Sequence, residues 1–135
     1  MLDDLGQRRL ARHHGIGHGD RIAVLAANEL EYITLFFAAQ RLGAILVPVN
    51  HRLTSREIAH IFNDCAPKLL VYQKEFASAV DELPPAARPA MRPLLGPGSF
   101  GEACRKSNAP VTWAARFEDP CMIIYTSGST GRPKG

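Results

Sequence analysis

The sequence predicts an α/β fold built from parallel βαβ units, and three observations support this class. Short apolar runs rich in β-branched residues recur at 21–26, 44–49 and 68–72. They lack the alternation of a half-exposed strand, so they are typical of strands buried on both faces of a sheet. Stretches with helical periodicity separate the runs, and this order predicts parallel strands joined by right-handed crossovers.

Capping residues and glycines set the bounds of the first elements. Residues 3–14 are expected to form a helix that stops at Gly15. After the first strand, Asn28 is a suitable N-cap for a mostly buried helix over 29–42, and Gly43 ends that helix. The second strand therefore begins directly after Gly43 and can lie beside the first strand.

The second crossover begins with a capping box. Thr54 and Glu57 stand three residues apart, and this spacing predicts a helix that ends near Asp64. The third strand follows, and a further helix is expected over 75–83. We assign all of residues 1–135 to one domain.

The second half of the sequence differs in composition. Six prolines and three glycines lie between Pro84 and Pro110, and they predict that residues 84–117 form a long surface connection. Another apolar strand is expected at 121–125, and it runs directly into the segment 126–135. The end of a buried strand is where open α/β sheets place their ligands.

Composition and charge exclude several classes of protein. The 135 residues are 46% apolar and 21% charged, with a formal net charge of +3, which excludes a disordered chain. Acidic and basic residues are interleaved without a run of five like charges, so nucleic-acid binding is not expected. No transmembrane segment and no targeting segment is recognisable, and the sequence therefore predicts a soluble cytoplasmic protein.

Cysteine and histidine spacings predict neither a disulfide framework nor a metal site. The three cysteines are odd in number and form no Cys-x-x-Cys pair; they are Cys65, Cys104 and Cys121. We expect them to be buried or half-buried thiols in a reducing compartment. The five histidines show no spacing typical of metal ligands, so no metal ligand is assigned.

The segment 126–135 carries the residues best suited to bind an anion. Its glycines permit positive φ angles and a close approach of a ligand, and successive amides can converge on a phosphate. Hydroxyl groups and one ammonium group add donors and positive charge. The residues of this candidate site are Thr126, Ser127, Gly128, Ser129, Thr130, Gly131 and Lys134. A flexible tail has the same composition, and the spacing is not that of a Walker A loop, because position 133 is proline.

The same segment resembles the signature of a known family. The run MIIYTSGSTGRPKG at 122–135, preceded by Glu118-Asp119-Pro120, is similar to the AMP-binding signature of adenylate-forming enzymes. These enzymes are acyl-CoA synthetases, luciferases and the adenylation domains of peptide synthetases. Segments of the family's early region are matched in the same order, at 19–25, 41–44, 47–50 and 52–58. The resemblance covers about residues 3–83 and 118–135, and the segments at 47–50 and 52–54 favour acyl- or aryl-CoA ligases.

The resemblance implies a ligase that works in two steps. ATP and a carboxylic acid would give an acyl-adenylate and pyrophosphate, and a thiol, usually coenzyme A, would then displace AMP. It also implies that the loop from Thr126 to Lys134 holds the β- and γ-phosphates of ATP with Mg²⁺ present. Gly128 and Gly131 would shape the backbone, the hydroxyl groups would donate hydrogen bonds, and Lys134 would supply the charge.

Members of this family are several times longer than this sequence, and three hypotheses follow. The family's adenine and ribose contacts, acyl pocket, coenzyme A site and C-terminal catalytic lysine have no counterpart here, and Lys134 is not that lysine. The first hypothesis is a fragment of an acyl-CoA ligase of fatty acid metabolism that is not catalytic alone. The second is a stand-alone phosphate- or nucleotide-binding module. The third is an interaction module that associates through exposed sheet surface. The sequence does not specify the carboxylic acid.

Overall fold

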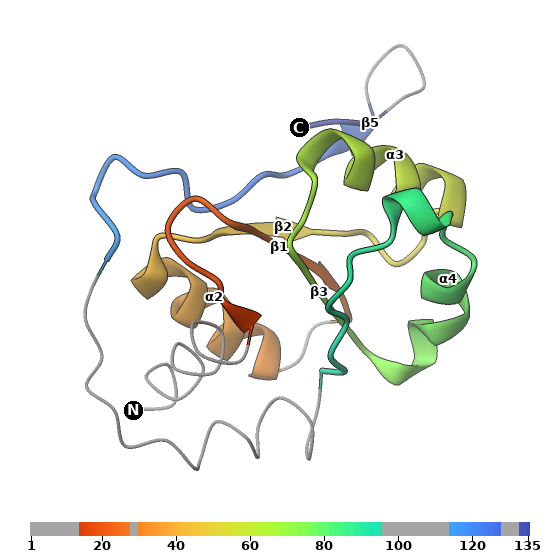
Figure 1. The fold of residues 1–135 in the computed structure, drawn as a ribbon, viewed down its shortest axis with the longest axis horizontal. Coiled ribbons are helices and arrows are strands. Elements are labelled where there is room, and N and C mark those ends of the chain that lie inside the picture. Colours follow the sequence, from red (N-terminus) through yellow and green to blue (C-terminus); the bar gives the residue numbers. More distant parts are fainter. Residues whose placement is uncertain (1–13, 28–29, 96–113, 128–132) are drawn as a thin grey trace.

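Three parallel strands form the centre of the molecule. The computed structural model describes residues 14–27, 30–95, 114–127 and 133–135 (Figure 1). Its sheet has the order β2-β1-β3, and the register places Ala23 opposite both Val47 and Leu70. The strands are β1 (Arg21–Leu25), β2 (Ile45–Pro48) and β3 (Leu69–Tyr72). The predicted α/β class and the parallel pairing are confirmed.

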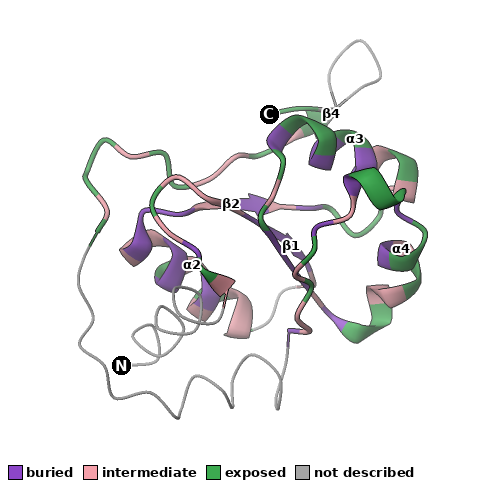
Figure 2. Ribbon diagram, viewed as in Figure 1, coloured by how far each residue is buried: buried purple, intermediate pink, exposed green. Residues whose placement is uncertain are grey.

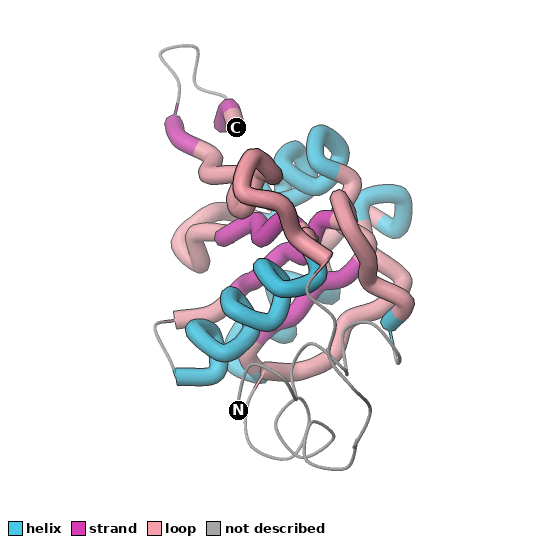
Figure 3. The backbone as a smooth tube through the Cα atoms, turned by 90° about the vertical axis from the view of Figure 1, so that its left-hand side faces the viewer, coloured by secondary structure: helices cyan, strands magenta, loops and turns pink. Residues whose placement is uncertain are grey.

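Helices cover both faces of this sheet. Helix α2 (Leu30–Leu42) packs on one face, and α3 (Ser55–Cys65) and α4 (Ala77–Asp81) pack on the other (Figures 1 and 3). Successive residues of β1 point to opposite faces, so Ile22 and Val24 join the core under α2 while Ala23 joins the core under α3. The two crossovers move to opposite sides of β1 across opposite faces, which gives both the same hand.

The predicted caps at the end of α2 and at the start of α3 are present, whereas Asn28, the predicted N-cap of α2, lies outside the described residues. Thr54 Oγ1 accepts a hydrogen bond from the Glu57 amide at 3.3 Å, and Glu57 Oε2 accepts one from the Thr54 amide at 2.8 Å. At the end of α2, Gly43 has φ +68°, and the His18 ring occupies the space that a Cβ there would need. A larger residue at this turn would therefore be strained and would displace His18.

The helix expected over 75–83 is shorter than predicted. A 3₁₀ turn at Lys74–Phe76 begins it, and only Ala77–Asp81 is α-helical. The Phe76 amide donates to the Gln73 carbonyl at 3.0 Å, three residues back, which tightens the first turn. Consecutive prolines at 84 and 85 then end the helix, because the residue before a proline is driven out of the α region.

The first part of the segment 84–117 differs from the surface connection that its prolines predict. A 3₁₀ turn spans Pro85–Ala87, and Ala87 and Leu95 are buried. Figure 2 shows that most other buried residues lie in the strands and on the helix faces that cover them. The Leu70 amide donates to the Met91 carbonyl at 3.0 Å, so this segment runs parallel to β3 along its outer edge. Prolines are tolerated on an edge that needs no donor from them. Residues 96–113 lie outside the described part of the chain.

The strand expected at 121–125 touches the sheet at one point. Met122 forms an isolated parallel bridge with Leu46 on the outer edge of β2, and the Ile123 amide donates to the Leu46 carbonyl at 2.9 Å. The backbone then leaves the sheet before a full strand forms. The helix expected over 3–14 falls almost entirely on residues 1–13, which lie outside the described residues.

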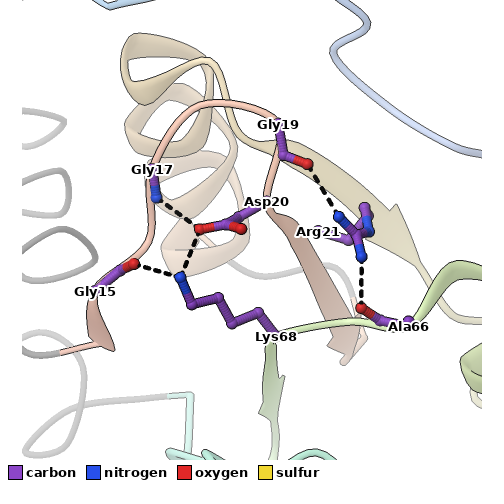
Figure 4. Close-up of polar contacts among 7 residues, drawn as sticks. All are labelled: Gly15, Gly17, Gly19, Asp20, Arg21, Ala66 and Lys68. Carbon is purple, nitrogen blue, oxygen red and sulfur yellow. Dashed lines mark hydrogen bonds and ion pairs between the residues drawn. The ribbon is translucent and has the colours of Figure 1, made fainter.

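A polar cluster fixes the glycine-rich turn before β1 (Figure 4). Lys68 Nζ donates to the Gly15 carbonyl at 2.6 Å and lies 2.8 Å from Asp20 Oδ2, which also accepts the Gly17 amide at 2.9 Å. Partial burial raises the pKa of Asp20, but its contacts with Lys68 and the Gly17 amide outweigh this and lower the pKa below its usual 3.8. The cluster therefore ties the turn to the start of β3.

Candidate functional site

The two ends of the predicted phosphate loop form a short antiparallel stem. Strand β4 (Thr126–Ser127) pairs with β5 (Pro133–Lys134), and the register places Thr126 opposite Lys134. Figure 1 shows this stem beside α3, at the edge of the molecule. The structure therefore brings the first and last residues of the candidate site together. Gly128, Ser129, Thr130 and Gly131 lie outside the described residues, so their place in the site stays a prediction.

Tyr125 lies at the base of this stem, and sequence reasoning gave it no role. Its hydroxyl group donates a hydrogen bond to Asp64 Oδ2, in the last turn of α3. Burial raises the pKa of the Tyr125 phenol, and the adjacent Asp64 carboxylate raises it further. The phenol therefore stays protonated and remains a donor. The only signal in the sequence is the place of this tyrosine, directly before the hydroxyl-rich run.

The end of α3 is held in place by Arg21 of β1. Its Nε donates to the Cys65 carbonyl at 2.7 Å and its Nη2 to the Ala66 carbonyl at 3.0 Å. Ala66 has φ +44°, a left-handed conformation that closes the helix, and its amide donates to the Phe62 carbonyl. A guanidinium group at a helix C-terminus also interacts favourably with the helix dipole. These hydrogen bonds hold the C-terminal end of α3, which Tyr125 contacts, against β1.

An open cleft of about 450 Å³ lies between this helix end and the stem. Cys65, Tyr125 and Gly135 are among its lining residues. Burial raises the pKa of the Cys65 thiol, and this effect outweighs the opposing influence of the nearby Tyr125 hydroxyl group, so the thiol stays protonated at neutral pH. Cys65 is buried as expected, whereas Cys121 is exposed, because only its backbone packs against β2.

The described residues were also searched for metal sites and membrane-spanning helices. Across residues 14–27, 30–95, 114–127 and 133–135, no three or more His, Cys, Asp or Glu side chains gather where they could hold a metal ion. Within the same ranges, no helix combines the length and the apolar character needed to cross a bilayer.

The chain is similar to curated proteins that are named as CoA ligases or synthases. Over 125 residues it is 37% identical to the long-chain-fatty-acid–CoA ligase FadD13 of Mycobacterium tuberculosis, covering 90% of this chain and 25% of that protein. It is 38% identical to a feruloyl-CoA synthase of Amycolatopsis sp., covering 92% of this chain and 24% of that protein. The chain thus spans about a quarter of the length of these curated relatives.

Solved structures and a family model agree with these relatives. The ATP-bound structure of MatB from Rhodopseudomonas palustris matches 99% of this chain and 27% of its own chain, with a TM-score of 0.81 and 28% identity. The family model described as AMP-binding enzyme matches residues 8–135, which include the loop stem and both βαβ units. From this match and these relatives, it follows that the chain belongs to the AMP-binding enzyme family.

Proposed function

We propose that this chain is the phosphate-binding part of an AMP-forming acyl-CoA ligase. In the proposed reaction, the carboxylate of a fatty or aromatic acid attacks the α-phosphorus of ATP, giving an acyl-adenylate and releasing pyrophosphate. The thiol of coenzyme A then attacks the acyl carbon and AMP leaves. The loop between β4 and β5 would hold the β- and γ-phosphates and steady the negative charge that develops on the departing pyrophosphate.

One observation of the structure carries this proposal. The β4–β5 pairing brings Lys134 opposite Thr126, so both ends of the loop are held together on one short stem. Both of these side chains are exposed, and neither is used to build the core. A loop closed in this way can direct successive amides and one ammonium group at the same anion. The similarity to a structure described as ATP-bound adds support.

Mg²⁺ would come to this site with the nucleotide. The described residues supply no cluster of acidic side chains for a divalent cation, whereas Mg²⁺ in nucleotide enzymes is held largely by substrate phosphates and water. When bound, the ion would neutralise charge on the β- and γ-phosphates. The chain's own part is then positional, since Lys134 and the hydroxyl-rich loop would orient those phosphates.

The test is a binding titration of the chain with MgATP and with magnesium pyrophosphate. Lys134→Ala removes a charged donor, so we expect the affinity for both ligands to fall by about tenfold or more. Lys74→Ala removes an exposed lysine on the 3₁₀ turn before α4 and is the matched control. Equal affinity of the wild-type chain and Lys134→Ala, or no binding by the wild-type chain, would refute the proposed site.

We also propose that the chain does not catalyse the reaction alone. It spans about a quarter of the length of its curated relatives, so most of what those proteins contain is outside this sequence. Incubation with ATP, coenzyme A and a panel of fatty and aromatic acids is expected to yield no AMP above background. AMP formation that disappears in Lys134→Ala would show that the chain is competent.

Self-association is the second candidate function, and exposed apolar residues on α2 favour it. Leu30, Ile33 and Phe37 are 68%, 53% and 52% exposed and lie along one side of the helix. This surface lies on α2, whereas the sequence predicted association through exposed sheet surface. Sedimentation should show Phe37→Ser to be more monomeric than Phe117→Ser, which removes an exposed phenylalanine elsewhere.

A further inference from the structure

Tyr125 connects the stem of the proposed phosphate loop to the main body of the fold. It directly precedes β4, and its hydroxyl group donates to Asp64 Oδ2, a residue 61 positions earlier in the chain. The contact is therefore tertiary and does not follow from local structure. A carboxylate acceptor makes this hydrogen bond stronger than one between neutral groups.

The acceptor of this bond sits on a fixed part of the molecule. Asp64 is followed by Cys65 and Ala66, whose carbonyl groups both accept hydrogen bonds from the Arg21 guanidinium group. Arg21 is itself the first residue of β1, the central strand of the sheet. An unbroken series of contacts therefore runs from the centre of the sheet, through the end of α3, to the Tyr125 hydroxyl group.

The ring of Tyr125 also contacts the returning strand of the stem. A Cβ at Gly135, the residue after β5, would lie 2.8 Å from Tyr125 Cζ and 2.7 Å from Ile123 Cγ2. The backbone at Gly135 can approach this closely only because it carries no side chain. Tyr125 is thus joined to β4 through the chain and to β5 through the contact of its ring with Gly135.

We propose that Tyr125 and Asp64 are positioning residues for the phosphate loop. Their hydrogen bond, together with the contact between the Tyr125 ring and Gly135, fixes the direction in which the β4–β5 stem leaves the sheet. This direction sets where Lys134 and the loop amides meet the phosphates, and neither Tyr125 nor Asp64 needs to contact the ligand. The inference rests on the proposed function and adds to it the part of the fold that orients the loop.

The test compares the affinity for magnesium pyrophosphate among variants that are matched in size. Tyr125→Phe keeps the ring but loses the donor, and Asp64→Ala loses the acceptor, so each should weaken binding by about threefold to tenfold. Asp64→Asn keeps an acceptor oxygen and should restore affinity to within about twofold of wild type. Asn63→Ala alters the neighbouring exposed residue of α3 and is the control.

A purely structural role would give a different pattern. In that case Tyr125→Phe would lower the urea midpoint while the folded variant bound pyrophosphate as tightly as wild type. The positioning role predicts weaker binding at an unchanged urea midpoint. If Lys134→Ala loses affinity and Tyr125→Phe does not, the positioning role is refuted and the proposed function stands.

A second measurement keeps the inference testable even if the wild-type chain binds no phosphate. Backbone order parameters from NMR relaxation report how rigidly Thr126 and Lys134 are held. In Tyr125→Phe we expect both to fall clearly while the value at Val24 in β1 stays constant. Unchanged order at the stem would overturn the positioning role, whatever the outcome of the binding titration.

Discussion

Residues 21–72 and residues 114–135 differ in how they are held in the structure. In the first region, β1 pairs along its length with β2 on one side and β3 on the other, and its side chains fill the cores on both faces. In the second region, the described β-pairing consists of one bridge at Met122 and a stem of two short strands, and the Ala114 amide also donates to the Arg41 carbonyl at 2.9 Å. None of its residues is among the buried core residues of the described chain.

The first region therefore supplies most of the stability of the fold, whereas the second region carries the residues of the proposed site. The first region obtains its stability from burial of apolar side chains, which depends little on any single polar contact. The second region relies on a few specific bonds to the rest of the fold. They include the bond of Tyr125 with Asp64 in the first region, and the bond of Asp119 Oδ2 with His18 Nε2, in the turn before β1, at 2.6 Å. Binding loops are commonly drawn from the less stable parts of a fold and rest on a rigid scaffold.

Truncation of one isoleucine in each region should give the largest contrast. Ile22 in β1 is fully buried and Ile124 is 61% exposed. We expect Ile22→Ala to lower the free energy of unfolding by about 2–5 kcal/mol, because it removes core contacts and leaves a cavity. Ile124→Ala should change it by less than about 0.5 kcal/mol. Urea denaturation checks both values, and equal losses would break the comparison.

Gly43 tests the place where the two regions meet through His18. Gly43→Ala would force a side chain into φ +68° and against the His18 ring, so we expect a loss of about 2 kcal/mol or more. Gly15→Ala has a similar φ of +59° with open space around it, and should cost only about 1 kcal/mol. Thermal denaturation compares the two variants. If His18→Ala does not reduce the cost of Gly43→Ala, the ring contact is not its cause.

The cap of α3 tests the helix that carries Asp64. Thr54→Ala removes the side-chain acceptor of the capping box, and we expect it to lower the free energy of unfolding by about 1 kcal/mol. Ser78→Ala changes an exposed hydroxyl group within α4 and should leave stability within about 0.5 kcal/mol of wild type. A Thr54→Ala variant as stable as Ser78→Ala would show that the cap contributes nothing.

Asp20 should give the smallest effect, and it depends on pH. Its pKa is lowered in the folded protein, so its stabilising contribution is present above the usual pKa of 3.8 and is lost as the pH falls through the lower folded value. Asp20→Asn should therefore be less stable than wild type at pH 7, by no more than about 1 kcal/mol, because Asp20 and Lys68 are partly exposed. The difference should vanish in strong acid. A difference that grew in acid would contradict this assignment, and Asp81→Asn in α4 is the control.

Most of the first region could be predicted from the sequence, because its signals are local and repeated. Gly43 and the Thr54–Glu57 pair mark the ends of helices through the chemistry of a few neighbouring residues, and both were confirmed. The apolar runs predict buried strands because each must be covered on two faces. Both signals depend on residues that are close together in the sequence, so they can be interpreted without knowledge of contacts between distant residues.

The remainder depended on contacts between distant residues, which composition does not reveal. Prolines between 84 and 95 predicted a surface connection, yet Met91 pairs beside Leu69 because the outer edge of β3 offers free backbone groups. For the candidate site, the residue types at Thr126 and Lys134 were evident and their pairing is now described. The role of Asp64 depends on a partner 61 residues away, and nothing in its own neighbourhood indicates it.

The bridge between Leu46 and Met122 has a consequence for the order of folding. The three central strands are contiguous between residues 21 and 72, so they need to close only short loops, whereas this bridge must close a loop that spans more than half of the chain. We therefore expect the nucleus to form from the strands between residues 21 and 72, with the segment that carries the proposed phosphate site docking late. During synthesis on a ribosome, the scaffold would then be complete before the segment that it orients has emerged.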